Sequence, residues 1–173
     1  MATVNIEFKA KAKDLIALEK KLLTLNPKYI GEDNQLDTYF NVAHGRLKLR
    51  EGNIEHSLIY YERINTAGAK QSDILLYQHN PDKTLKEILE KVNGVKVVVD
   101  KKRRIYFIDN VKFHFDLVAG LGTFVEVEAI DSNGDIGIDK LKEQCSFYAA
   151  FFDIAATDYI AFSYSDLIED KNN

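Results

Sequence analysis

Basic side chains alternate with leucines in residues 45–51. In a β-strand, this period of two places Arg46, Lys48 and Arg50 on one face and the leucines on the other. Ammonium and guanidinium groups bind phosphate oxygens, and arginine can bind two oxygens at once. The segment therefore indicates one strand of a phosphate-binding surface. A surface strand whose charged side faces water is the alternative.

The same period of two recurs with acidic residues. Residues 124–128 place two glutamates on one face, and residues 4–9 place Glu7 on the same face as Lys9. Carboxylates without cysteine or clustered histidine favour a hard cation such as magnesium or manganese. Both sets of charges together suit a polyphosphate bridged by metal, because either set alone is costly to hold inside a protein.

Strands with one ionic face and one aliphatic face suggest a closed sheet. Its charged side would surround a wet channel, and its apolar side would lie under helices. Turn residues divide the alternating segments into about eight strands. They are expected near residues 4–10, 35–40, 45–51, 56–63, 74–77, 95–107, 111–117 and 123–130.

Three apolar patterns predict helices. Leucines at three- and four-residue spacing follow Asp14, a suitable N-cap residue. A second apolar stripe follows Asp82 and ends at Gly94, a good C-terminal signal. The C-terminal third is also helical in pattern, and we expect its last helix to begin at Thr157.

Composition limits the class of protein. The formal net charge is −4, from 23 basic and 27 acidic residues, which argues against a general nucleic-acid binder. A single cysteine, Cys145, excludes an intrachain disulfide and fits a reducing compartment. No segment reads as a signal peptide or approaches the roughly 20 apolar residues of a membrane span. We therefore expect a cytoplasmic protein without nucleic-acid or membrane partners.

Several motifs, in order and spacing, resemble the CYTH family, the triphosphate tunnel metalloenzymes. The family's opening Glu-x-Glu-x-Lys strand stands here as Asn5-Ile6-Glu7-Phe8-Lys9. The most specific match is residues 116–128, with an aspartate, a Leu-Gly turn and a Glu-x-Glu strand. Residues 163–167 are similar to the branch that contains class IV adenylyl cyclases. Further matches are residues 35–40, residues 47–51, Arg63 and the pair Lys101 and Arg103.

The resemblance implies an α+β fold, an eight-stranded antiparallel β-barrel with flanking helices, as one domain over residues 1–173. Its tunnel would hold a linear triphosphate with Mg²⁺ or Mn²⁺ as cofactor. It implies catalytic and metal-binding roles for Glu7, Glu126 and Glu128, and a metal-binding role for Asp116. The phosphate-binding residues that it implies are Lys9, Arg46, Lys48, Arg50, Arg63, Lys101 and Arg103.

Two details depart from this pattern or stay open. Asn5 replaces the first glutamate of the opening motif, so a second metal site is expected to be weaker or absent, although the amide oxygen can still contribute. Whether Lys101 and Arg103 or their neighbours Lys102 and Arg104 point inward is also open, since a slip of one residue exchanges the faces.

The sequence leaves two reactions open. In a cyclase, the 3′-hydroxyl of ATP attacks the α-phosphorus and pyrophosphate leaves. In a triphosphatase, water attacks a terminal phosphorus of inorganic or organic triphosphate. The C-terminal motif favours the cyclase, and the simplicity of hydrolysis favours the triphosphatase. A non-catalytic polyphosphate or nucleotide binder is a third hypothesis, motivated by Asn5, and a homodimer is compatible with the sequence.

Overall fold

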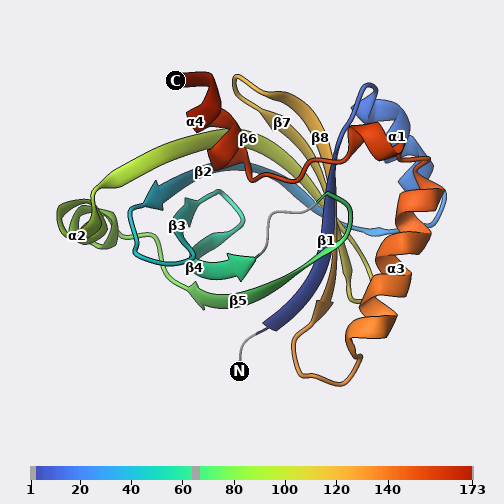
Figure 1. Cartoon of the computed structure of the whole chain (residues 1–173), viewed down its shortest axis with the longest axis horizontal. Coiled ribbons are helices and arrows are strands. Elements are labelled where there is room, and N and C mark those ends of the chain that lie inside the picture. The colour runs from blue at the N-terminus through green and yellow to red at the C-terminus, as the bar shows by residue number, and fades with distance from the viewer. Residues whose placement is uncertain (1–2, 64–66, 173) are drawn as a thin grey trace.

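A computed structural model describes residues 3–63 and 67–172, which form a closed β-barrel with helices outside it (Figure 1). All strand pairs are antiparallel, and the order around the described barrel is β1-β5-β4-β3-β2-β6-β7-β8. The predicted α+β, eight-stranded barrel is therefore confirmed. The strands are β1 (Thr3–Lys11), β2 (Lys28–Phe40), β3 (Arg46–Glu51), β4 (His56–Arg63), β5 (Lys70–Gln78), β6 (Val95–Ile108), β7 (Val111–Val118) and β8 (Gly122–Asp131).

The helices lie around this barrel. Figure 1 shows α1 and α3 together on one side and α2 on the opposite side. Asp14 caps the first helix, as the sequence predicts, because it accepts a hydrogen bond from the Ala17 amide; Asp82 caps the second by accepting one from the Thr84 amide. No helix in the described residues is long and apolar enough to cross a membrane. The helices are α1 (Leu15–Leu23), α2 (Lys83–Asn93), α3 (Ile138–Phe151) and α4 (Tyr164–Asn172).

The start of β2 differs from the prediction. The strand begins at Lys28 rather than near residue 35, and the added residues pair with the far half of β6. Their sequence is polar and contains Gly31, so local pattern favours a loop. The long β6 supplies a hydrogen-bonding partner that overrides this preference.

The predicted start of the last helix was wrong. Thr157 lies in a short 3₁₀ turn, Ala156–Asp158, and α4 begins only at Tyr164. Ser163 caps the true start, because its Oγ accepts from the Asp166 amide and Asp166 Oδ2 accepts from the Ser163 amide. This reciprocal pair is a capping box, and it fixes the first turn of α4.

The main apolar core lies outside the barrel wall, under α1 and α3. Outward side chains of β1, β7 and β8 pack against the inner faces of these helices. The Cys145 thiol is buried in this core and donates to the Ile6 carbonyl at 3.1 Å. Other buried members are Phe8, Leu22, Phe113, Phe115, Val125, Val127, Leu141, Tyr148 and Phe152.

The C-terminal segment covers one end of the barrel, the end at which β3 and β5 begin. Arg46 Nη2 lies 2.9 Å from Asp166 Oδ2, and Lys70 Nζ donates to the Ala161 carbonyl at 2.7 Å. Tyr159 forms a bridge with Ala10, next to the end of β1. These contacts tie the segment to three different strands, so this end of the channel is covered.

Truncating Phe113 should lower the free energy of unfolding by about 3–5 kcal/mol, since buried aromatic removal leaves a cavity. Its ring is fully buried and contacts Tyr148 edge-on, with centroids 4.7 Å apart. Urea titration of Phe113→Ala measures the loss. The control is Phe147→Ala, whose ring is 57% exposed and should cost far less. Equal losses would contradict the placement of this core.

Candidate functional site

The barrel encloses a cavity of about 1090 Å³. It reaches the end of the barrel opposite the C-terminal segment, where its lining includes His56, His79 and Phe107. Eight of the predicted site residues line it, and they come from β1, β3, β6 and β8: Glu7, Lys9, Lys48, Arg50, Lys101, Arg103, Glu126 and Glu128.

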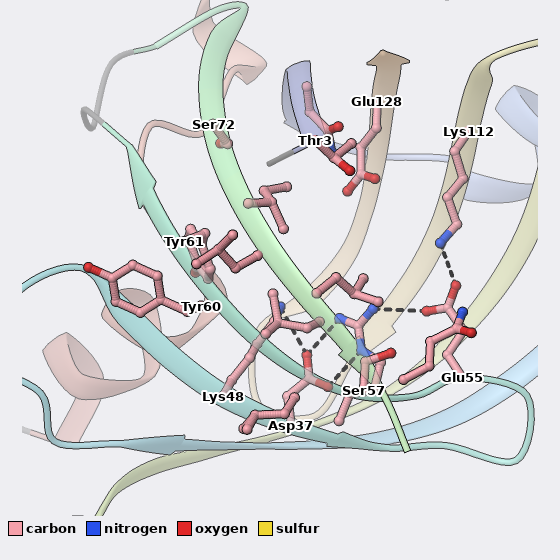
Figure 2. A pocket seen from close by; sticks show the side chains of 18 of the residues that line it. Thr3, Asp37, Lys48, Glu55, Ser57, Tyr60, Tyr61, Ser72, Lys112 and Glu128 are labelled. Atoms are coloured by element: carbon pink, nitrogen blue, oxygen red, sulfur yellow. Dashed lines mark hydrogen bonds and ion pairs between the residues drawn. The ribbon is translucent and has the colours of Figure 1, made fainter. Parts of the chain in front are cut away.

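Basic groups gather on one wall around a single carboxylate, Asp37 of β2. Arg50 forms a two-pronged bond with it, Nε to Oδ1 at 2.9 Å and Nη2 to Oδ2 at 2.8 Å. Lys101 Nζ lies 2.7 Å and Lys48 Nζ 3.4 Å from Oδ2 (Figure 2 labels Asp37 and Lys48). Burial opposes ionisation of Asp37, but these three positive neighbours outweigh it and hold its pKa well below the usual value.

The pKa of Lys101, in the same cluster, is also lowered, which favours its neutral form. Burial lowers its pKa to about 7; Asp37 opposes this change, whereas Arg50, Arg103 and Lys48 add to it. The structure also resolves the register of β6, because Lys101 and Arg103 are buried in the barrel while Lys102 is exposed. Arg104 points outward to Glu19, at 2.8 Å.

Glu55 extends this wall toward the open end. It accepts hydrogen bonds from Arg50 Nη1 at 2.9 Å and from Lys112, and Figure 2 shows the Glu55 carboxylate directed toward Lys112. The turn that carries Glu55 is held by Asp33, which accepts amide hydrogen bonds from three of its residues. Gly52 allows this approach, since a Cβ there would lie 2.5 Å from Asp33 Oδ1.

Asp116 accepts hydrogen bonds from an arginine and from a tyrosine hydroxyl. Arg103 donates to both of its oxygens, at 2.7 and 2.6 Å, and the Tyr164 hydroxyl donates to Oδ2 at 2.7 Å. Tyr164 thus brings the C-terminal segment into contact with the covered end of the cavity. Lys9 Nζ lies over the Tyr164 ring, 4.0 Å from its centroid. A metal-binding role for Asp116 stays a prediction.

Carboxylates gather on the other wall, formed by β1 and β8. Glu126 lies 3.1 Å from Arg103 and 3.8 Å from Lys9. Burial opposes its ionisation, but Lys9, His114 and Arg103 keep its pKa well below the usual value. Burial raises the pKa of Glu128 to about 7, and the negative charges of Glu126 and Glu7 contribute.

His114 is a member of this site that the sequence analysis did not select. It is 1% exposed, and burial together with the charge of Arg103 lowers its pKa to about 3, which keeps the imidazole neutral. The sequence feature that could have identified it is the two-residue spacing of Lys112, His114 and Asp116, which places all three on one face of β7. His114, Glu126 and Glu128 each offer one ligand atom, all within 4.8 Å of one another, so these residues fit a divalent ion.

Two predicted phosphate-binding residues are placed differently. Arg46 is not among the cavity-lining residues and instead contacts Asp166 of the C-terminal segment. Arg63 ends β4, but its side chain lies outside the described part of the structure. Their roles toward phosphate remain predictions.

The fold and this cavity define a class: β-barrel proteins with a water-accessible core of opposed basic and acidic walls. The model of the CYTH domain matches residues 4–151, so the chain belongs to the CYTH domain family. No curated protein matches the sequence.

Solved structures share the same fold. The PH1012 protein of Pyrococcus horikoshii is 24% identical, with a TM-score of 0.79 over 94% of this chain and 98% of that one. A candidate adenylate cyclase of Vibrio parahaemolyticus is 16% identical, with a TM-score of 0.79 over 98% and 99%. The candidate adenylyl cyclase HpAC1 of Hippeastrum, which is described as having a dominant triphosphatase activity, is 13% identical, with a TM-score of 0.64 over 99% of this chain and 96% of that one.

The pKa of Lys101 predicts that metal-free binding of inorganic triphosphate weakens as the pH rises through 7. Only the protonated ammonium attracts the anion, and a lysine with a pKa of about 7 is about one-tenth protonated at pH 8. Between pH 6 and pH 8, the triphosphate affinity of the wild type, measured by calorimetry, should therefore fall up to about tenfold further than that of Lys101→Arg, which stays charged. Parallel pH profiles would contradict the shifted pKa.

Proposed function

We propose that the protein is a divalent-metal-dependent enzyme acting on a nucleoside triphosphate, most closely a class IV adenylyl cyclase that converts ATP to cyclic AMP and pyrophosphate. The observation that carries the proposal is the composition of the basic wall. In the described part of the chain, the ion pairs of Lys48, Arg50, Lys101 and Lys112 involve two carboxylates, Asp37 and Glu55. Such an excess of buried positive charge favours an anionic ligand.

The opposed walls support a polyphosphate between them. Figure 2 shows Glu128 across the open cavity from Asp37 and Lys48. Phosphate oxygens on the basic wall would face the carboxylates of the acidic wall. Glu7, Glu126 and Glu128 would hold a divalent ion, which would supply charge neutralisation at the phosphoryl oxygens. The neutral amide of Asn5, on the same strand face as Glu7, supports a single ion.

The shape of the cavity supports a nucleotide rather than bare triphosphate. One end is covered by the C-terminal segment, so phosphate groups enter from the other end. The remaining volume of the cavity of about 1090 Å³ extends toward His56, His79 and Phe107, whose flat rings suit a base and sugar. This places the α-phosphorus between the basic cluster and the mouth.

In this orientation the side chains have distinct roles. Lys48, Arg50 and Lys101 bind the β- and γ-phosphates and stabilise the charge of departing pyrophosphate. The 3′-hydroxyl gives its proton to a carboxylate of the acidic wall, and its oxygen forms a bond to the α-phosphorus as the bond from that phosphorus to the pyrophosphate oxygen breaks.

Terminal hydrolysis is the second candidate. The basic and acidic walls alone are sufficient to hold a triphosphate, and attack by water would need no base-binding site. The dominant triphosphatase activity of HpAC1, which shares this fold, supports terminal hydrolysis as the alternative reaction. A non-catalytic binder is the third candidate.

Product analysis distinguishes the three candidates. Purified protein is incubated with ATP or inorganic triphosphate, in Mg²⁺ or Mn²⁺, and the products are separated by chromatography. We expect cyclic AMP and pyrophosphate from ATP. Orthophosphate, chiefly from inorganic triphosphate, would establish the hydrolase instead. Binding without turnover would establish the binder, and Glu126→Gln should abolish whichever turnover is seen.

Lys48→Ala should weaken substrate engagement by about 2 kcal/mol, roughly thirtyfold in kcat/KM, as expected for one charge-assisted phosphate contact. Lys48 is the most accessible of the three cations around Asp37, so its removal disturbs the buried ion pairs least. The matched control is Lys102→Ala on the outer face of β6, which should leave kcat/KM unchanged. Equal kinetics in both variants would refute the assignment of the basic wall.

A further inference from the structure

His114 is buried in a way that its surroundings do not explain. Its side chain is 1% exposed, and neither ring nitrogen has good hydrogen-bond geometry with a described residue, although Nδ1 lies 3.5 Å from Glu126 Oε2. A buried polar group without a partner costs stability and usually marks a site that is completed by something else. The ring belongs to the inner face of β7, directly opposite Glu126 in the register of β7 and β8.

The distances around His114 are those of ligands that share a metal ion. Nδ1 lies 3.5 Å from Glu126 Oε2 and 3.8 Å from Glu128 Oε1. At metal–ligand bond lengths of about 2.1 Å, neighbouring ligand atoms lie about 3.0–3.4 Å apart. Nδ1 therefore needs to approach each carboxylate oxygen by only a few tenths of an ångström, and all three ligand atoms already lie within 4.8 Å of one another.

We propose that His114 Nδ1 binds the divalent ion together with Glu126 and Glu128, and that this nitrogen makes the site select Mn²⁺ over Mg²⁺. The inference rests on the proposed metal-dependent function and deepens it. Magnesium prefers oxygen ligands and water, whereas imidazole nitrogen suits transition metals. Asn5 is a second buried polar group of this kind on the inner face of β1, because its Oδ1 also lacks a hydrogen-bond partner among the described residues.

The test measures metal binding directly, without substrate. Calorimetric titration of Mn²⁺ and of Mg²⁺ into metal-free protein is compared for the wild type and His114→Gln. We expect Mn²⁺ affinity to fall at least about tenfold in the variant, with Mg²⁺ affinity changed less than about twofold. The matched control is His44→Gln, an exposed histidine in the turn between β2 and β3, which should change neither affinity.

Two outcomes would overturn the proposal: unchanged Mn²⁺ affinity in His114→Gln, or equal losses for both ions. A second measurement needs no variant and covers the case in which His114→Gln does not fold. The electron spin-echo spectrum of Mn²⁺ bound to the wild-type protein should show modulation by ¹⁴N, which a coordinated imidazole produces. Its absence would exclude the nitrogen ligand.

The metal site itself is tested separately from its nitrogen ligand. Glu126→Gln should lose both Mn²⁺ and Mg²⁺, because it removes a charged ligand common to both ions. Wild-type protein that binds Mn²⁺ without a nitrogen signal would keep the proposed function and reject the role of His114. Wild-type protein that binds neither ion would reject the metal-dependent function as well.

Discussion

Buried charge determines how the inside of this barrel is built. Taking an ion out of water costs several kcal/mol even after the protein relaxes, so each inward lysine, arginine or carboxylate must have partners. Asp37 meets this requirement for three cations at once, and Asp116 does so for Arg103. The sharing is unequal, because more basic groups than carboxylates occupy the wall around Asp37. Stability of the empty barrel and readiness for an anion thus arise from one arrangement.

The outer surface of the barrel wall contributes to the main apolar core. The apolar core lies between the outer surface of β1, β7 and β8 and the helices α1 and α3. This arrangement moves much of the hydrophobic burial outside the barrel and leaves room for charged side chains inside, where a second apolar cluster that includes Tyr39, Val99 and Phe124 is also buried. Period-two alternation makes this possible, because β1, β7 and β8 each contribute one face to the core and the other face to the barrel interior.

That alternation is also why much of the site was predictable. Residues 46–50 and 124–128 each identify their inward side chains by type. The run of four basic residues from Lys101 to Arg104 does not identify its inward side chains by type, because both of its faces are basic. Only pairing with β2 and β7 selects Lys101 and Arg103. Glu55 and Tyr164 were beyond reach for another reason: Asp33 positions the first and a capping box the second, through contacts that leave no periodic pattern.

The closure of the barrel has a consequence for the order of folding. β1 pairs with β8, whose last residue is Asp131, so the seam closes only after most of the chain is available. Pairing of β2 with β3 and of β3 with β4 joins close neighbours in sequence and can form early. The part of the basic wall that lies on β2 and β3, Asp37 with Lys48 and Arg50, can therefore assemble before Lys101 and Lys112 join it from β6 and β7. The contact between Lys9 and Glu126 spans the seam, and the two-walled cavity exists only once that last ladder has formed.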